Sequence, residues 1–236
     1  LIKRTQNVRE RVFIGLSGGY DSGAIACSLE KSSIAFKAYT IPGAENKKII
    51  NERKNVISDM CILDITPEEF LFEKEFLKNE CEDFYFRGKP AARPDKASAG
   101  LSFICRTARD SGYKIYISGQ GADEIVSDYG WNGRKFYNHS QFGGKFPEDL
   151  SSIFPWNSFY GGTQLKYLGK EECVAGSHGV ETRYPFLDTH LVQEFLWLTA
   201  RLKNSNYKAP IDFFLRNNKF PYTLNEKVGF RPNHNF

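Results

Sequence analysis

Several features that define common classes of protein are missing from the 236-residue sequence. It has no stretch of about 20 apolar residues and no signal-peptide pattern, so we expect no membrane-spanning helix. Its lysines and arginines are dispersed instead of gathered in a run, and its net charge is only +4. A nucleic-acid-binding surface would need a basic stripe or patch. We therefore expect neither a membrane nor a nucleic acid as a partner.

The sequence also lacks the cysteine patterns of disulfide scaffolds and zinc sites. Its five cysteines are widely spaced and contain no C-x-x-C pair, and its four histidines show no zinc-ligand spacing. An odd number of scattered cysteines is typical of reduced thiols. These observations predict a cytoplasmic protein.

What the sequence does contain is enough apolar material for a sizeable core, with 41% hydrophobic residues, 20 Phe and 12 Tyr. Strand-like segments (12–16, 33–41, 61–65 and 113–119) alternate with helical ones (45–60, a helix capped by Thr66 and Pro67, and 97–112). Such alternation predicts βαβ units and a parallel sheet. A stretch rich in glycine and aromatics follows from about 130 to 162, which we expect to form an irregular insertion over the carboxyl edge of the sheet. The chain is mostly helical after about 160.

The segment VFIGLSGGYDSG (12–23) joins a short apolar strand to a helix through a glycine-rich turn at Ser17, Gly18 and Gly19. A strand, a turn of small residues and a helix N-terminus together present backbone N–H groups that suit a phosphate. The turn lacks the G-K-[ST] ending of a Walker loop, and its glycine spacing does not fit the dinucleotide fingerprint. A generic turn after a strand is the alternative interpretation.

A second segment, ISGQGADE (117–124), has the same layout. Each segment follows a strand with Ser-Gly and then supplies an aspartate, Asp21 in the first and Asp123 in the second. Ligands of parallel α/β folds bind where the carboxyl ends of strands meet helix N-termini. Two aspartates facing one polyphosphate would hold Mg²⁺, which prefers carboxylate and phosphate oxygens.

The string S-G-G-Y-D-S after a first strand resembles the PP-loop of the N-type ATP pyrophosphatases, which cut ATP into AMP and pyrophosphate. Three later strings narrow the resemblance to the synthetase domain of the asparagine synthetase family. They are SGQGADE (118–124), SHGVETRYPFLD (177–188), and YKAPIDFFLRNNKFP (207–221) followed by EKVGF (226–230). The four motifs occur in the family's order and cover about nine tenths of the chain.

The resemblance implies an α/β fold of the adenine nucleotide α-hydrolase type, with a parallel five-stranded sheet flanked by helices and a mostly helical C-terminal part. One domain would span residues 1–236, with a nucleotide-binding core at about 10–130 and the helical part at about 160–236. The family also carries an N-terminal glutaminase domain that supplies ammonia. That domain is absent from this sequence, so we expect a fragment of a longer protein, a separate glutaminase subunit, free ammonia or an amine substrate.

The resemblance also implies site residues. ATP would be held by Leu16, Ser17, Gly18, Gly19, Asp21, Ser22, Ile41 and Gly119. Mg²⁺ would bind Asp21 and Asp123. The expected catalytic residues are Lys208, Gln120, Glu181 and Arg183, with Lys208 stabilising the pentavalent phosphorus and the acyl-adenylate. Structural alternatives remain, because Lys208 could be a solvated lysine at a helix start, Asp188 a simple N-cap, and Lys227 a residue that only closes the C-terminal tail.

One position departs from the family, since Gln120 stands where asparagine synthetases have glutamate. An amide cannot take up a proton at neutral pH, so this site would give no general-base help to an attacking amine. The expected function is ATP-dependent activation of a carboxylate, aspartate or a related acid, followed by amidation with ammonia or an amine. The alternatives are a tailoring ligase that amidates or cyclises another acid or peptide, and a catalytically weakened ATP-binding protein.

Overall fold

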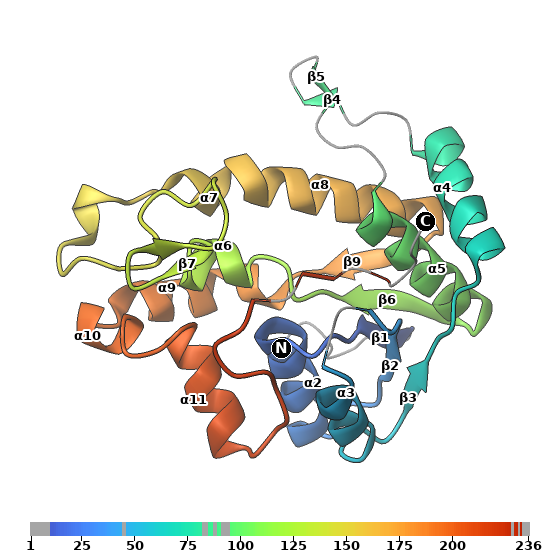
Figure 1. Cartoon of the computed structure of the whole chain (residues 1–236), viewed down its shortest axis with the longest axis horizontal. Helices are drawn as coiled ribbons and strands as arrows, with labels where there is room; N and C mark the ends of the chain where they lie inside the picture. The colour runs from blue at the N-terminus through green and yellow to red at the C-terminus, as the bar shows by residue number, and fades with distance from the viewer. Residues whose placement is uncertain are drawn as a thin grey trace.

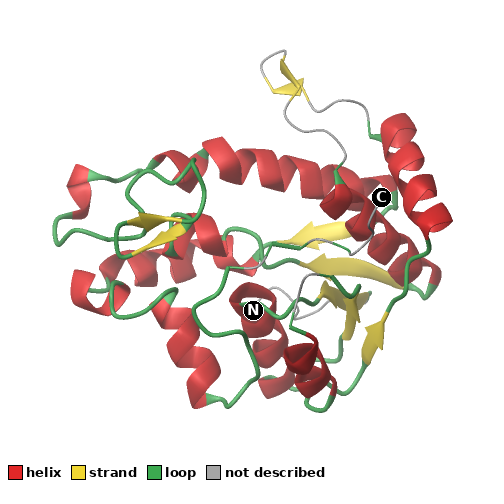
Figure 2. Ribbon diagram, in the orientation of Figure 1, coloured by secondary structure: helices red, strands yellow, loops and turns green. Residues whose placement is uncertain are grey.

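The computed structural model describes residues 10–43, 46–81, 95–227, 229–230 and 232, and the backbone of residues 85–86 and 89–90. Its centre is a five-stranded parallel sheet in the order β3-β2-β1-β6-β9. The strands are β1 (Arg11–Gly15), β2 (Lys37–Thr40), β3 (Met60–Ile62), β6 (Tyr113–Ile117) and β9 (Glu181–Arg183). The predicted parallel five-stranded sheet is therefore confirmed, and Figures 1 and 2 show its strands between layers of helices.

The central strands are apolar on both faces because helices cover both faces. Val12 and Ile14 of β1 belong to one buried cluster, whereas Phe13 between them belongs to another. β6 repeats this division, with Ile115 and Ile117 in the first cluster and Tyr116 in the second. The sheet therefore separates two hydrophobic cores.

Helices α2 (Tyr20–Lys31) and α11 (Ala209–Asn217) contact each other and supply residues of the first core. The second core is covered by α4 (Pro67–Glu80), α5 (Lys96–Asp110) and α8 (Gly162–Ser177), which contact one another in turn. Helix α4 begins as predicted, with Thr66 as its N-cap and Pro67 as its first residue, and Thr66 and Glu69 form a reciprocal capping box.

The remaining elements are short. They are α3 (Lys47–Lys54), β4 (Tyr85–Phe86), β5 (Lys89–Pro90), α6 (Ala122–Val126), β7 (Gly130–Trp131), β8 (Arg134–Lys135), the 3₁₀ turns η1 (Leu150–Ser152) and η2 (Pro185–Leu187), α7 (Asn157–Tyr160), α9 (Thr189–Trp197) and α10 (Ala200–Lys203). The expected irregular insertion contains the small β7–β8 hairpin and α7. Among the described residues, no helix is both long and apolar enough to cross a membrane.

Three element predictions need correction. The second strand is β2, residues 37–40, and not 33–41, because residues 32–33 still form the turn that ends α2. The helix expected over 45–60 ends at Lys54, and Met60 already belongs to β3. The third strand is β3, residues 60–62, and not 61–65. The C-terminal part is mostly helical as expected, and it also holds β9, a three-residue run that is too short to show strand alternation.

Candidate active site

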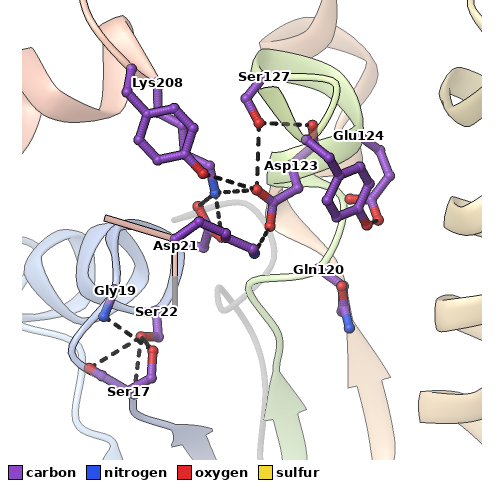
Figure 3. A network of polar contacts seen from close by, with 12 residues as sticks. Ser17, Gly19, Asp21, Ser22, Gln120, Asp123, Glu124, Ser127 and Lys208 are labelled. Atoms are coloured by element: carbon purple, nitrogen blue, oxygen red, sulfur yellow. Dashed lines mark hydrogen bonds and ion pairs between the residues drawn. The ribbon is translucent and has the colours of Figure 1, made fainter. Parts of the chain in front are cut away.

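The two glycine-rich loops lie against each other at the carboxyl ends of β1 and β6. A Cβ added to Gly119 would lie 3.1 Å from the Cβ of Asp21 and 3.2 Å from the backbone nitrogen of Ser22. These distances are tighter than most Cβ contacts, so the absence of a side chain at Gly119 favours the close approach of the two loops. The structure thus brings together the two segments that the sequence predicts to share a site, and Figure 3 shows their polar residues.

Serine hydroxyls hold the first loop in shape. The backbone N–H of Ser17 donates to Ser22 Oγ at 3.1 Å, and the two hydroxyl oxygens of Ser17 and Ser22 are 2.9 Å apart. The N–H of Gly19 donates to Ser17 Oγ at 3.2 Å. These short-range hydrogen bonds fold the turn before the first residues of α2, so the helix N-terminus and its partial positive charge face the loop.

A cluster of four charged side chains lies between the loops, and we call Asp21, Asp123, Lys208 and Lys227 the charge cluster. The Lys208 ammonium lies 2.6 Å from both carboxylate oxygens of Asp21 and 2.8 Å from Asp123 Oδ1. Lys227 bonds the other oxygen of Asp123, and the Tyr207 hydroxyl donates to Asp123 Oδ1 at 3.3 Å. Figure 3 shows Lys208 reaching between the two aspartates.

Burial decides how these groups titrate. Burial alone would raise the pKa of Asp123, but Lys208 and Lys227 outweigh it and hold that pKa well below its usual range. Burial would lower the pKa of Lys208, yet Asp123 and Asp21 keep it above its usual value. Burial raises the pKa of Asp21, with Lys208 acting in the opposite direction. Lys208 is therefore a charged lysine that is only 3% exposed, and it is not the solvated lysine of the alternative interpretation.

Asp21 and Asp123 are the residues of the charge cluster that could hold a divalent cation. Two carboxylates already lie on opposite sides of one small cation, the Lys208 ammonium, and carboxylate oxygens are ligands that Mg²⁺ accepts. Within the described residues, no group of three or more His, Cys, Asp or Glu side chains could hold a metal. Further ligands would therefore have to come from phosphate oxygens and water, as is usual for Mg²⁺.

Leu16 and Ile41, two further residues predicted to contact ATP, follow the carboxyl ends of β1 and β2. Leu16 is buried, and its N–H donates to the carbonyl of Tyr39 at 2.8 Å, which fixes the start of the first loop on β2. Ile41 follows β2 and is buried in the second core. A Cβ on Gly18 would lie 3.4 Å from Thr223 Oγ1, so the loop also has the C-terminal segment close by.

Gln120 is half-buried at the end of β6, where a buried glutamate supports its loop. The N–H of Gln120 donates to Ser118 Oγ at 3.1 Å. Ser118 Oγ in turn donates to the carboxyl oxygens of Glu171 at 2.9 and 2.8 Å. Burial raises the pKa of Glu171 to about 7. A buried, titratable carboxyl therefore lies one hydroxyl away from the backbone of Gln120.

The structure does not bring Glu181 and Arg183 into the charge cluster. The two residues lie on the edge strand β9, where Arg183 Nε donates to Glu181 Oε1 at 2.7 Å. The carbonyl of Arg183 accepts from the N–H of Ser118 at 2.9 Å, so β9 supports the second loop through its backbone. Asp188 is the N-cap of α9 and accepts from the N–H of His190 at 3.1 Å.

Sequence reasoning missed Arg53 and Glu171 at this site. Arg53 is fully buried, and its guanidinium donates to backbone carbonyls of the first loop. Neither residue lies in a recognisable motif, and each reaches the site only through the folding of a distant helix. Their only sequence signal is a charged residue at a position where the helix faces the core, as Arg53 does beside Ile50 and Ile57.

The fold and site define a parallel α/β protein with a glycine-rich loop and a carboxylate–lysine cluster at the carboxyl edge of its sheet. The family model for asparagine synthase matches residues 3–172, well over half of the chain. The chain therefore belongs to the asparagine synthase family, a family of ATP-utilising ligases.

The chain is similar to two curated proteins and to one solved structure. The chain is 24% identical over 212 residues to the "Putative asparagine synthetase (glutamine-hydrolyzing) 1" of Methanocaldococcus jannaschii, covering 87% of this chain and 36% of that protein. It is 29% identical over 100 residues to the human "Asparagine synthetase domain-containing protein 1", covering 41% of this chain and 14% of that protein. The chain thus spans about a third or less of the length of these relatives.

The solved structure is the NMN synthetase of Francisella tularensis, which is 14% identical with a TM-score of 0.34. The match covers 94% of this chain and 90% of that one. A likeness this weak supports no conclusion about activity.

Proposed function

We propose that the chain is an AMP-forming carbon–nitrogen ligase that makes an amide through an acyl-adenylate. In the first step, a substrate carboxylate oxygen attacks the α-phosphorus of ATP, the bond to the bridging oxygen of the β-phosphate breaks, and pyrophosphate leaves. In the second step, ammonia or an amine attacks the acyl carbon, AMP leaves with the electrons of the broken acyl–oxygen bond, and the attacking nitrogen loses a proton. Family membership supports the overall reaction type.

The observation that carries the proposal is the position of Lys208 between Asp21 and Asp123, next to the glycine-rich first loop. A charged ammonium that is already buried and oriented stabilises negative charge as it develops on phosphate oxygens, without reorganising solvent. Lys227 adds a second positive charge on the other side of Asp123. We propose that these two lysines stabilise the negative charge that develops on the phosphate oxygens in the first step.

We propose the remaining roles from the family resemblance. The N–H groups of the first loop and the hydroxyls of Ser17 and Ser22 would hold the leaving pyrophosphate. Mg²⁺, held by Asp21 and Asp123, would neutralise phosphate charge when bound. Leu16, Ile41 and Gly119 would line the adenosine part of the site. Binding the acid and the nucleotide together would supply much of the rate through proximity.

The substrates are proposed from the family and from the names of relatives. Aspartate or a related small acid is the proposed carboxylate. The archaeal relative is named as glutamine-hydrolysing, which supports a glutaminase domain or subunit as the source of ammonia. Free cysteines at all five positions suit the cytoplasm, where ATP and such acids are available.

The test is pyrophosphate release from Mg·ATP in the presence of ammonium, with aspartate compared against a panel of carboxylic acids and peptides. Release that depends on aspartate, with asparagine as the product, would support the proposed reaction. Release only with another acid would support a tailoring ligase. ATP binding without release for any acid would contradict the ligase proposal and leave a nucleotide-binding protein.

Gln120 is the specific observation that favours a different acyl acceptor or acid, because the amide cannot accept the proton that an attacking ammonia loses. We expect Gln120→Glu to raise the yield of amide per pyrophosphate released with ammonium at neutral pH, by up to about 10²-fold, the lower end of general-base contributions. Gln120→Asn is the matched control. An unchanged yield would mean that another group accepts the proton.

A further inference from the structure

Arg53 of α3 is buried completely, yet its guanidinium contacts three backbone carbonyls from two distant parts of the chain. Its Nη1 bonds the carbonyl of Ser17, its Nη2 donates to the carbonyl of Gly19 at 2.7 Å, and its Nε donates to the carbonyl of Pro221 at 2.8 Å. A planar guanidinium with five N–H donors can meet several acceptors at once in a fixed geometry. Arg53 thus joins the phosphate loop to the C-terminal segment.

The surroundings of Arg53 are shaped to hold this group. A Cβ on Gly23 of α2 would lie only 2.3 Å from Arg53 Nη2, so the absence of a side chain there leaves the space that the guanidinium fills. The ring of Phe220 lies 5.4 Å from the guanidinium carbon on another side. Gly23 therefore has a packing role that a helix-interior glycine does not usually have.

The C-terminal segment continues along the loop after its contact with Arg53, and we call residues 220–227 the strap. The N–H of Thr223 donates to the carbonyl of Gly18 at 3.1 Å, and the N–H of Asn225 donates to the Tyr20 hydroxyl at 3.0 Å. Lys227 then reaches Asp123. The strap is thus fixed at successive points on the loop before it delivers its lysine to the charge cluster.

Peptide geometry links these contacts to phosphate binding. The peptide unit is planar and trans, so the N–H that follows a carbonyl points in the opposite direction. When Arg53 binds the carbonyls of Ser17 and Gly19, the N–H groups of Gly18 and Tyr20 are turned to the side away from Arg53. On that side, at the N-terminus of α2, a phosphate would accept hydrogen bonds from the N–H groups of the loop.

We propose that Arg53 is a positioning residue for triphosphate binding, acting through the backbone of the first loop and through the strap that carries Lys227. The inference rests on the proposed function, because it concerns the loop that would bind ATP. It predicts that Arg53 matters for ligands whose phosphates reach the loop, ATP and pyrophosphate, and not for AMP, whose single phosphate lies nearer the adenosine.

The experiment measures dissociation constants of Mg·ATP, Mg·pyrophosphate and AMP for wild type and two variants, well below their unfolding temperatures. Arg53→Lys keeps the positive charge but loses the guanidinium that binds three carbonyls. Gly23→Ala retains Arg53, but the added methyl group displaces its guanidinium. For both, we expect ATP and pyrophosphate affinity to fall by about 10- to 100-fold, in line with the cost of small misplacements in a site, and AMP affinity to stay unchanged.

Arg106→Lys is the matched control. Arg106 Nε bonds the buried Glu73 at 2.6 Å between α4 and α5, away from the loops, so its loss should lower thermal stability without changing the ratio of ATP to AMP affinity. A purely structural role for Arg53 would give the same result as this control. Because Gly23→Ala keeps the buried charge and its acceptors, it decides the question if Arg53→Lys does not fold.

The outcomes separate the two proposals. Wild type that binds neither ATP nor pyrophosphate would overturn the proposed function and this inference with it. Wild type that binds both more tightly than AMP, with the same preference in Arg53→Lys and Gly23→Ala, would overturn this inference alone. A selective loss for ATP and pyrophosphate in the variants, and not in Arg106→Lys, is the result that we expect.

Discussion

Lys208 has a backbone conformation that lysine rarely adopts, with φ of 50° at the N-cap of α11. A non-glycine residue in the left-handed region is uncommon, and such residues persist where surrounding contacts hold them. Its side chain makes no cap hydrogen bond and instead reaches Asp21 and Asp123. The local backbone is thus held by the charge cluster, which links the shape of this turn to the site.

We expect Lys208→Met to reduce pyrophosphate release by about 10²- to 10³-fold, the size of effect seen when one preorganised group that stabilises charge is removed. Asp21 and Asp123 would also lose their shared cation, so the free energy of unfolding should fall. Single-turnover pyrophosphate release at saturating Mg·ATP measures the first effect, and urea unfolding measures the second.

Lys203→Met is the matched control for this change. Lys203 is another buried lysine, 4% exposed, whose ammonium donates to the carbonyl of Leu196 at 2.9 Å in the helical part. Its loss should lower stability and leave pyrophosphate release intact. Equal rates in the two variants would contradict a role for Lys208 in the chemistry.

Some residues of the candidate site could be predicted from the sequence and others could not. Asp21 and Asp123 lie in strings that follow strand ends, so their meeting follows from the rule that parallel strands end at one edge, whereas Lys208 was expected there only from the family resemblance. Arg53 could not be found in this way. Its carbonyl partners lie 34 to 168 positions away in sequence, and no local pattern encodes such a contact.

At the scale of elements, strong local sequence signals predicted the bounds of helices and strands, whereas weak signals did not. The capping box at Thr66 and the glycine-marked ends of β1 and β6 fixed their elements closely. The apolar residues Val56 and Ile57 suggested that α3 continues, but Ile57 is buried as part of the turn toward β3. β9 is positioned by backbone pairing with β6, and a run of only three residues is too short for its sequence to predict a strand.

Contact between α8 and the end of β6 makes the stability of the protein depend on pH. Burial raises the pKa of Glu171 from 4.5 to about 7, so the folded state keeps a proton that the unfolded state releases. Between these values the folded state binds more protons, and its stability falls as pH rises. The contribution is fully present below about pH 4.5 and is lost above about pH 7.

We therefore expect Glu171→Gln to stabilise the protein relative to wild type more at pH 8 than at pH 5, by about 2–3 kcal/mol. Urea unfolding of both proteins at pH 5, 6, 7 and 8 gives this difference directly. Glu172→Gln, a change at the exposed neighbour on the same helix, is the control. A difference that does not vary with pH would show that Glu171 is ionised in the folded protein across this range.

At the scale of the whole molecule, the sheet separates the core that supports α2 and the first loop from the core beneath α5. Phe13 lies fully in the second core, with its ring stacked on Tyr116 at 5.2 Å and edge-on to Tyr39 at 6.0 Å. The side chains of β1 that face α2 are Val12 and Ile14. A change at Phe13 therefore acts on stability from the face opposite the loop helix.

We expect Phe13→Ala to lower the free energy of unfolding by about 3–5 kcal/mol, the usual cost of deleting a buried aromatic ring. The ATP dissociation constant of the folded variant should stay close to that of wild type. Thermal unfolding and equilibrium nucleotide binding at low temperature measure the two effects. A large loss of ATP affinity would mean that the second core controls the shape of the loop.

The strap has a consequence for how the protein is made. Asn225 contacts Tyr20 across 205 positions, so the loop near the start of the sheet is completed by residues that are made much later than the loop itself. Chains fold progressively from the N-terminus during synthesis, and contacts between distant residues form late. A nascent chain can therefore assemble all five strands while the carbonyls of its first loop and Asp123 still lack the partners that the strap brings. Translation thus delivers the sheet before the strap that completes the first loop.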